Sequence, residues 1–140
     1  MATTTATISV SSNILSYPIS INNSMTMKKA GSCHGLEETS GLNTKKITST
    51  TAFKLFGNAE ATAGGASKVY IRNSGASTTD FFYVGYGEDL AAATVETIGR
   101  LYGGNWMLIP WDAVAATTHD IYAKSSTVEP MHIEYMAFTE

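Results

Sequence analysis

The sequence has little cysteine, little basic charge and no long apolar run. One cysteine, Cys33, stands among 140 residues, so a disulfide within the chain is excluded and stability must come from packing or association. Nine Lys and Arg against twelve Asp and Glu give a net charge of −3, with no basic stripe to neutralise a nucleic acid backbone. No stretch is long enough to span a membrane, and the N-terminus lacks a signal-peptide pattern. We therefore expect no nucleic-acid binding, no membrane anchoring and no Sec-dependent export.

Motifs for catalysis or for a cofactor are missing as well. The cysteine and the three histidines fall into three short pairs, Cys33–His34, His119–Asp120 and His132–Glu134. Adjacent side chains such as those of the first pair rarely point together, and the third pair needs a further ligand from another strand. The glycine-rich stretches lack the strand, spacing and helix of a phosphate-binding loop, and no G-x-S-x-G motif is present. The sequence predicts no catalytic residue, no metal site and no cofactor, and hence a protein that is not an enzyme.

What the sequence does contain is alternation of apolar and polar residues with a period of two, which is typical of half-buried strands. In residues 131–138, MHIEYMAF, the odd positions are apolar, whereas His132 and Glu134 share the opposite face. Many short strands separated by polar loops predict an all-β protein with an antiparallel, jelly-roll-like β-sandwich. At most one short helix is expected, at residues 88–97, where alanines favour helix. The expected strands are Thr7–Val10, Pro18–Ile21, Met25–Lys29, Ile47–Phe56, Lys68–Asn73, Phe81–Tyr86, Thr97–Tyr102, Trp106–Trp111, Asp120–Lys124 and Met131–Phe138.

Two segments depart from this pattern. Residues 1–16 are rich in Thr and Ser, carry no charged side chain, and include Ile8 and Val10 in weak alternation. We expect an N-terminal extended arm over residues 1–16 and a single β-sandwich domain over residues 17–140. The arm is suited to strand addition at a sheet edge of an adjacent subunit, or else it forms the first strand of its own domain. Residues 28–46 mix charge and glycine with few apolar anchors, which predicts a long loop.

The stretch 98–113, IGRLYGGNWMLIPWDA, combines a Gly-Gly pair with two tryptophans that bracket a proline. Its Gly-Gly pair predicts a turn that joins strands 97–102 and 106–111 in a hairpin. Pro110 cannot donate to a sheet ladder, which places it at an edge, a bulge or a strand end. Strand 106–111 is apolar on both faces, so a loop or a neighbouring subunit is expected to cover the second face. One face holds Trp106, Leu108 and Pro110, and the other holds Met107, Ile109 and Trp111. The residues expected at an interface or in packing are Ile8, Val10, Tyr102, Trp106, Pro110 and Trp111.

Three successive stretches carry a resemblance to a known class of proteins. They are KVYIRNSGASTTDFFYVGYG, IGRLYGGNWMLIPWDA and DIYAKSSTVEPMHIEYMAF, which together cover roughly residues 66–138. This progression resembles small structural proteins of tailed bacteriophages, especially phages of marine bacteria and cyanobacteria. The resemblance implies a virion component that is assembled in the host cytoplasm.

Three functional readings stay open at this point. The first is a capsid decoration or cement protein, which stabilises the shell through contacts with its own copies and with the major capsid protein or other virion proteins. The second is a tail, neck or fibre-associated subunit. The third is a carbohydrate-binding module that attaches to the host through Tyr102, Trp106 and Trp111. Both structural readings predict self-association, as a trimer or a symmetric array.

Overall fold

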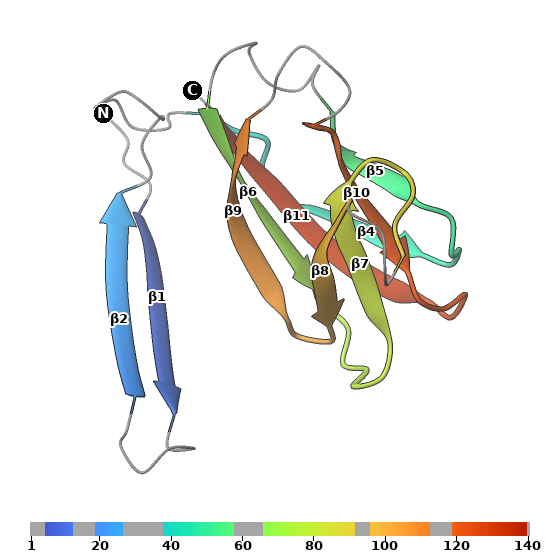
Figure 1. Ribbon diagram of the computed structural model, residues 1–140, viewed down its shortest axis with the longest axis horizontal. Coiled ribbons are helices and arrows are strands. Elements are labelled where there is room, and N and C mark those ends of the chain that lie inside the picture. Colours follow the sequence, from blue (N-terminus) through green and yellow to red (C-terminus); the bar gives the residue numbers. More distant parts are fainter. Residues whose placement is uncertain are drawn as a thin grey trace.

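A computed structural model of the chain describes residues 5–12, 19–26, 38–57, 66–91, 96–112 and 119–139. These ranges hold eleven strands and no helix, which confirms the expected all-β fold (Figure 1). Nothing in the described part of the chain is a helix long and apolar enough to cross a membrane. The strands are β1 (Thr5–Ser12), β2 (Ile19–Thr26), β3 (Glu38–Thr39), β4 (Asn43–Ile47), β5 (Phe53–Phe56), β6 (Ala66–Asn73), β7 (Phe81–Tyr86), β8 (Thr97–Tyr102), β9 (Trp106–Asp112), β10 (Ile121–Ser125) and β11 (Met131–Thr139).

Strands β4 to β11 form a sandwich of two antiparallel sheets. One sheet has the order β4-β11-β6-β9, with the short β3 also paired to β11, and the other has the order β5-β10-β7-β8. The chain passes from one sheet to the other at every connection from β4 to β11 except the one between β7 and β8. Eight strands wound in this way into two facing sheets are a jelly roll, so the expected sandwich is confirmed.

The hydrophobic core lies between the two sheets. Val69 and Ile71 of β6 and Val84 of β7 are fully buried and belong to one cluster with members from both sheets. Trp111 of β9 packs its ring against Phe56 of β5, with 5.7 Å between the ring centroids. Because a strand turns successive side chains to opposite faces, burial of these residues directs their neighbours in sequence away from the core.

The expected hairpin over residues 97–111 is wrong in its pairing, although both of its strands exist. Strand β8 pairs with β7 and strand β9 pairs with β6, so the turn between them joins the two sheets. The turn is fastened to the loop after β6: the N–H of Gly103 donates to the carbonyl of Ser77, and the N–H of Gly104 donates to the carbonyl of Asn73. A Cβ on Gly103 would collide with the backbone of Ser77, so glycine is required for this close approach.

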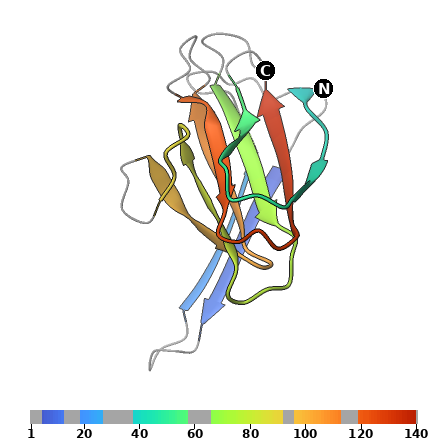
Figure 2. The ribbon, with the colours of Figure 1, turned by 90° about the vertical axis from the view of Figure 1, so that its right-hand side faces the viewer.

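The described part of the N-terminal arm is extended, as β1, but it is half of a hairpin. Strand β1 pairs antiparallel with β2 along its whole length, from Thr5 opposite Thr26 onwards. Two separate strands are expected at Pro18–Ile21 and Met25–Lys29, whereas the described residues 19–26 form the single strand β2, because the pairing continues through its two asparagines; residues 18 and 27–29 lie outside the description. The hairpin stands beside the sandwich, on the side of β6 and β9 in Figure 1, and behind the sandwich strands in Figure 2. The division of the chain into an arm over 1–16 and a domain over 17–140 stays a prediction.

Three further differences concern the limits of the elements. The long loop expected over residues 28–46 is wrong in its second half, which contains β3 and most of β4; residues 28–37 lie outside the described part. The strand expected over Ile47–Phe56 is interrupted, because Ser49 Oγ accepts a hydrogen bond from the N–H of Thr51 and turns the chain. Of the possible helix at 88–97, the described residues are not helical, and residues 92–95 lie outside the description.

One buried carboxylate, that of Asp120 just before β10, is paired with a lysine of β5. The Asp120 side chain is buried and forms an ion pair of 2.5 Å with the ammonium of Lys54, whose side chain is half-exposed. The hydrogen bond to Asp120 raises the pKa of Lys54 above its ordinary value of 10.5. Because the folded-state pKa is raised, the stabilisation is fully present below pH 10.5 and is lost as pH rises through the folded-state pKa.

We therefore expect a pH-dependent difference in melting temperature between the parent and Lys54→Met. The parent should melt at a higher temperature at neutral pH, and the difference should narrow as pH rises above about 10.5, where the unfolded parent loses the Lys54 proton before the folded parent does. Thermal melts of both proteins across this range measure the difference directly and cancel the titration of tyrosines common to both. A constant difference up to pH 12 would contradict the assignment.

Candidate functional site

The outward face of the sheet β4-β11-β6-β9 is the candidate site. On β6, burial of Val69 and Ile71 turns Tyr70 and Arg72 outward, and on β11 burial of Ile133 turns Glu134 outward. The strand register aligns these side chains in three rows of three across β9, β6 and β11. The rows, which together we call the outer face, are Trp106–Arg72–Glu134, Leu108–Tyr70–Met136 and Pro110–Lys68–Phe138.

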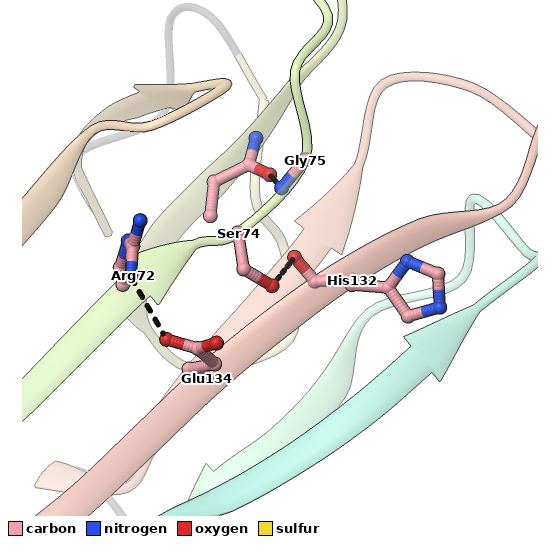
Figure 3. Close-up of polar contacts among 6 residues, drawn as sticks. Arg72, Ser74, Gly75, His132 and Glu134 are labelled. Carbon is pink, nitrogen blue, oxygen red and sulfur yellow. Dashed lines mark hydrogen bonds and ion pairs between the residues drawn. The ribbon is translucent and has the colours of Figure 1, made fainter.

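The first row combines an exposed aromatic ring with an ion pair. The Trp106 residue is 50% exposed, and its ring lies 6.5 Å from that of Tyr70 between centroids. Arg72 donates to Glu134 at 3.4 Å, so the two charges neutralise each other (Figure 3). An open hollow of about 450 Å³ is lined by Tyr70, Arg72, Gly104 and Trp106. This corner of the outer face therefore offers aromatic surface beside charged hydrogen-bonding groups.

A second polar contact fixes the same corner. The N–H and the hydroxyl of Ser74 both donate to the carbonyl of His132, at 3.0 and 3.3 Å, which ties the end of β6 to β11. The His132 ring itself points away from Glu134 in Figure 3, although both residues lie on the same face of β11 as expected. The pair therefore does not converge on one point as two ligands of a metal would.

The other nucleophile and metal-ligand types lie elsewhere. Asp120 is engaged by Lys54, and the ring Nδ1 of His119 lies 3.1 Å from the carbonyl of Asp112. Cys33 and His34 lie outside the described residues. Within the ranges that the structure describes, no three His, Cys, Asp or Glu side chains come together as a metal site.

The six residues expected at an interface or in packing separate into different environments. Trp106 and Pro110 lie together on the outer face, and Pro110 is in the edge strand β9, which is one of the positions expected for it. Trp111 is buried in the core, with 1% exposed. Tyr102 belongs to β8 in the other sheet, where its ring contacts Phe81 at 5.0 Å between centroids. The expected set of Tyr102, Trp106 and Trp111 is therefore not one surface.

Ile8 and Val10 lie on a second exposed apolar surface, on the hairpin β1–β2. The register places Val10 opposite Ile21 and Ile8 opposite Asn23 on one face. Ile8, Val10 and Ile21 are 41%, 47% and 46% exposed, and we call them the hairpin face. The opposite face presents hydroxyl and amide side chains, including a Thr7–Ser24 hydrogen bond of 3.1 Å. The hairpin is amphipathic, and its apolar side is open.

Sequence reasoning missed Tyr70, Arg72 and Met136 as members of the candidate site. The alternation in KVYIRN does place Tyr70 and Arg72 opposite the apolar positions. Which strands flank β6, and in which register, depends on pairing between residues far apart in the chain, so the rows are not visible in the sequence. Comparisons with known proteins add no guide: neither a family model, nor a curated protein, nor a solved structure matches the chain.

Proposed function

We propose that the protein is a structural subunit of a tailed-bacteriophage virion, and within that class a capsid decoration or cement protein. The observation that carries the proposal is that one small chain has two outward-facing surfaces with aligned apolar side chains, the outer face with the exposed Trp106 and the hairpin face. Isolated apolar residues on a surface are ordinary, whereas aligned rows of them mark sites of association. The resemblance of residues 66–138 to small phage structural proteins supplies the biological setting.

The jelly roll is compatible with this role without selecting it. Viral capsid proteins and lectins both use this architecture, so the fold alone does not separate a shell subunit from a sugar-binding module. Association through apolar surface suits a subunit that must link neighbours in a shell, because burial of such surface is the dominant favourable term in most protein association. A tail, neck or fibre-associated subunit would use the same surfaces and differs in location and copy number.

The experiment that tests this function is localisation on intact particles. Gold-labelled antibodies raised against the purified protein should decorate the capsids of phage particles from the culture that carries the gene, and quantitative mass spectrometry should find hundreds of copies per particle if it is a shell protein. Labelling confined to tails, with a few tens of copies at most, would move the protein to the tail reading. Its absence from purified particles would overturn the virion proposal.

Carbohydrate binding is a second candidate, and the hollow beside Trp106 favours it. An exposed tryptophan next to Tyr70, with Arg72 and Glu134 able to hydrogen-bond hydroxyl groups, has the mixed character of ligand sites. The residue set differs from the expected one, because Tyr102 and Trp111 lie elsewhere. Glycan-array binding that is lost in Trp106→Ala and kept in Ile98→Ala, a change at an exposed residue of β8, would support this reading.

A further inference from the structure

The hairpin β1–β2 has an apolar side, the hairpin face, that no other segment described by the structure covers. Its two strands pair with each other, and an isolated two-stranded hairpin is at best marginally stable in water. No side chain of β1 or β2 carries a charge, so an apolar partner could cover the hairpin face without burying an ion. The hairpin is thus built to pack against another apolar surface.

The outer face has the properties of that surface. Its middle row, Leu108–Tyr70–Met136, is uncharged, and in the first row Arg72 and Glu134 already neutralise each other. Arg72 and Glu134 would therefore keep each other as partners when an uncharged layer packs on this face. The other cation of the outer face, Lys68, lies in the third row, from which its long side chain can reach the rim of a covering layer.

The dimensions of the two surfaces also agree. Strands β1 and β2 have eight residues each, and β9, β6 and β11 have seven, eight and nine. Strands of this length are about 25–30 Å long, so the hairpin can lie along the whole outer face at the usual sheet-to-sheet spacing of about 10 Å. One hairpin alone covers a narrow strip of the outer face. When two copies each pack their hairpin onto the other, the buried area doubles and approaches that of a stable interface.

Within one copy these surfaces do not close on each other. Even with the hairpin present, Val10 stays 47% exposed and Trp106 stays 50% exposed. The partner is therefore to be sought in another molecule. We propose that the hairpin β1–β2 of one copy packs its hairpin face onto the outer face of a second copy.

This packing differs from strand addition at a sheet edge. One edge of β1 is already paired with β2, and the neighbouring edge strand of the outer face, β9, contains Pro110, which has no N–H to donate. Face-to-face packing needs neither edge. The inference names a second copy of the chain as the partner of the outer face, and so deepens the proposed function. It rests on that function only for the role of the contact in the particle.

Thiol cross-linking in purified protein tests the contact. In a Cys33→Ser background, Val10→Cys in one population and Leu108→Cys in another are mixed and treated with a short bismaleimide. We expect covalent dimers joining the two populations, in about tenfold higher yield than with Ser9→Cys in place of Val10→Cys, because contact raises the effective concentration of the second thiol. Ser9 is the matched control, since it lies on the opposite side of the same strand.

The same cysteine pairs show whether the hairpin contacts the outer face of a second copy or that of its own chain. A double variant with both cysteines, diluted until collisions are rare, should give little internal cross-link. Efficient internal cross-linking there, or equal yields with Val10→Cys and Ser9→Cys, would overturn the proposal.

A charge substitution gives a second readout that needs no cross-linker. Val10→Asp would place a carboxylate on the buried apolar contact and should weaken self-association by about tenfold or more in sedimentation equilibrium, whereas Ser9→Asp should not. Equal association of the parent and both variants would refute the contact even if the cysteine variants fail to fold. If the hairpin contacts a second copy but the protein is absent from phage particles, the contact is confirmed and the virion role is refuted.

Discussion

Replacing Trp111 with alanine is expected to destabilise the protein by about 3–5 kcal/mol, the usual cost of removing a large buried ring. Trp111 is 1% exposed, and its ring packs against Phe56 of the facing sheet. Its indole N–H donates to the carbonyl of His119 at 2.7 Å, so the substitution also leaves that carbonyl without this donor. Urea denaturation of parent and variant, followed by tryptophan-independent circular dichroism, measures the difference in the free energy of unfolding.

Trp106→Ala is the matched control, because it removes the same side chain from the same strand. Trp106 faces outward and is half-exposed, so we expect a loss below about 1 kcal/mol, as is usual for surface positions. Equal losses in the two variants, measured at a protein concentration too low for self-association, would mean that the outer face is buried within the single subunit. The two tryptophans therefore report separately on the core and on the outer face.

The opposite roles of these tryptophans were only half predictable from sequence. A spacing of five residues on a strand places them on opposite faces, and the structure has them so. Both faces of the strand are apolar, so composition could not say which face is the core. Which face is the core depends on β5 and β6, which lie far away in the chain. Strand β5 supplies the ring neighbour of Trp111, and β6 supplies that of Trp106.

Partners that lie far away in the chain also explain why the hairpin expected around Gly103 and Gly104 is wrong in its pairing. Local turn chemistry correctly predicts a reversal between β8 and β9, because glycine permits the positive φ of 80° at Gly104. Pairing of the two strands does not follow from a reversal. Hydrogen bonds from the turn to Asn73 and Ser77 direct β9 into the sheet of β6, and these partners are close only in the folded molecule.

Strands with a strong apolar pattern were predicted closely, whereas β4, which lacks one, was missed. β6, β7 and β11 each bury alternate residues and coincide closely with their expected limits. In β4 the side chain of Ile47 alone is buried, and the four residues before it are exposed. That strand exists because β11 offers a free edge to pair with, which no local pattern reveals.

The turn and the two sheets meet at one buried amide, which makes Asn73 the other position where a single change should cost most. Asn73 is fully buried at the end of β6. Its Nδ2 donates to the carbonyl of Leu101 on β8 at 2.9 Å, and its Oδ1 accepts from the N–H of Gly75 at 3.0 Å. One side chain therefore joins the two sheets and also shapes the loop that holds the glycine turn.

Asn73→Leu keeps a similar volume but leaves the Leu101 carbonyl and the Gly75 N–H without these partners. A buried polar group that loses its partner costs about 1–3 kcal/mol, so we expect a loss of about 2–4 kcal/mol for the two. Ser74→Ala, which removes one longer hydrogen bond of 3.3 Å to His132, should cost below about 1 kcal/mol and serves as the neighbouring control. Thermal and urea unfolding of the parent and the two variants measure these losses in the free energy of unfolding. If Asn73→Leu unfolds like the parent, the inter-sheet hydrogen bond is not a source of stability, and apolar packing between the sheets alone holds β8 against β6.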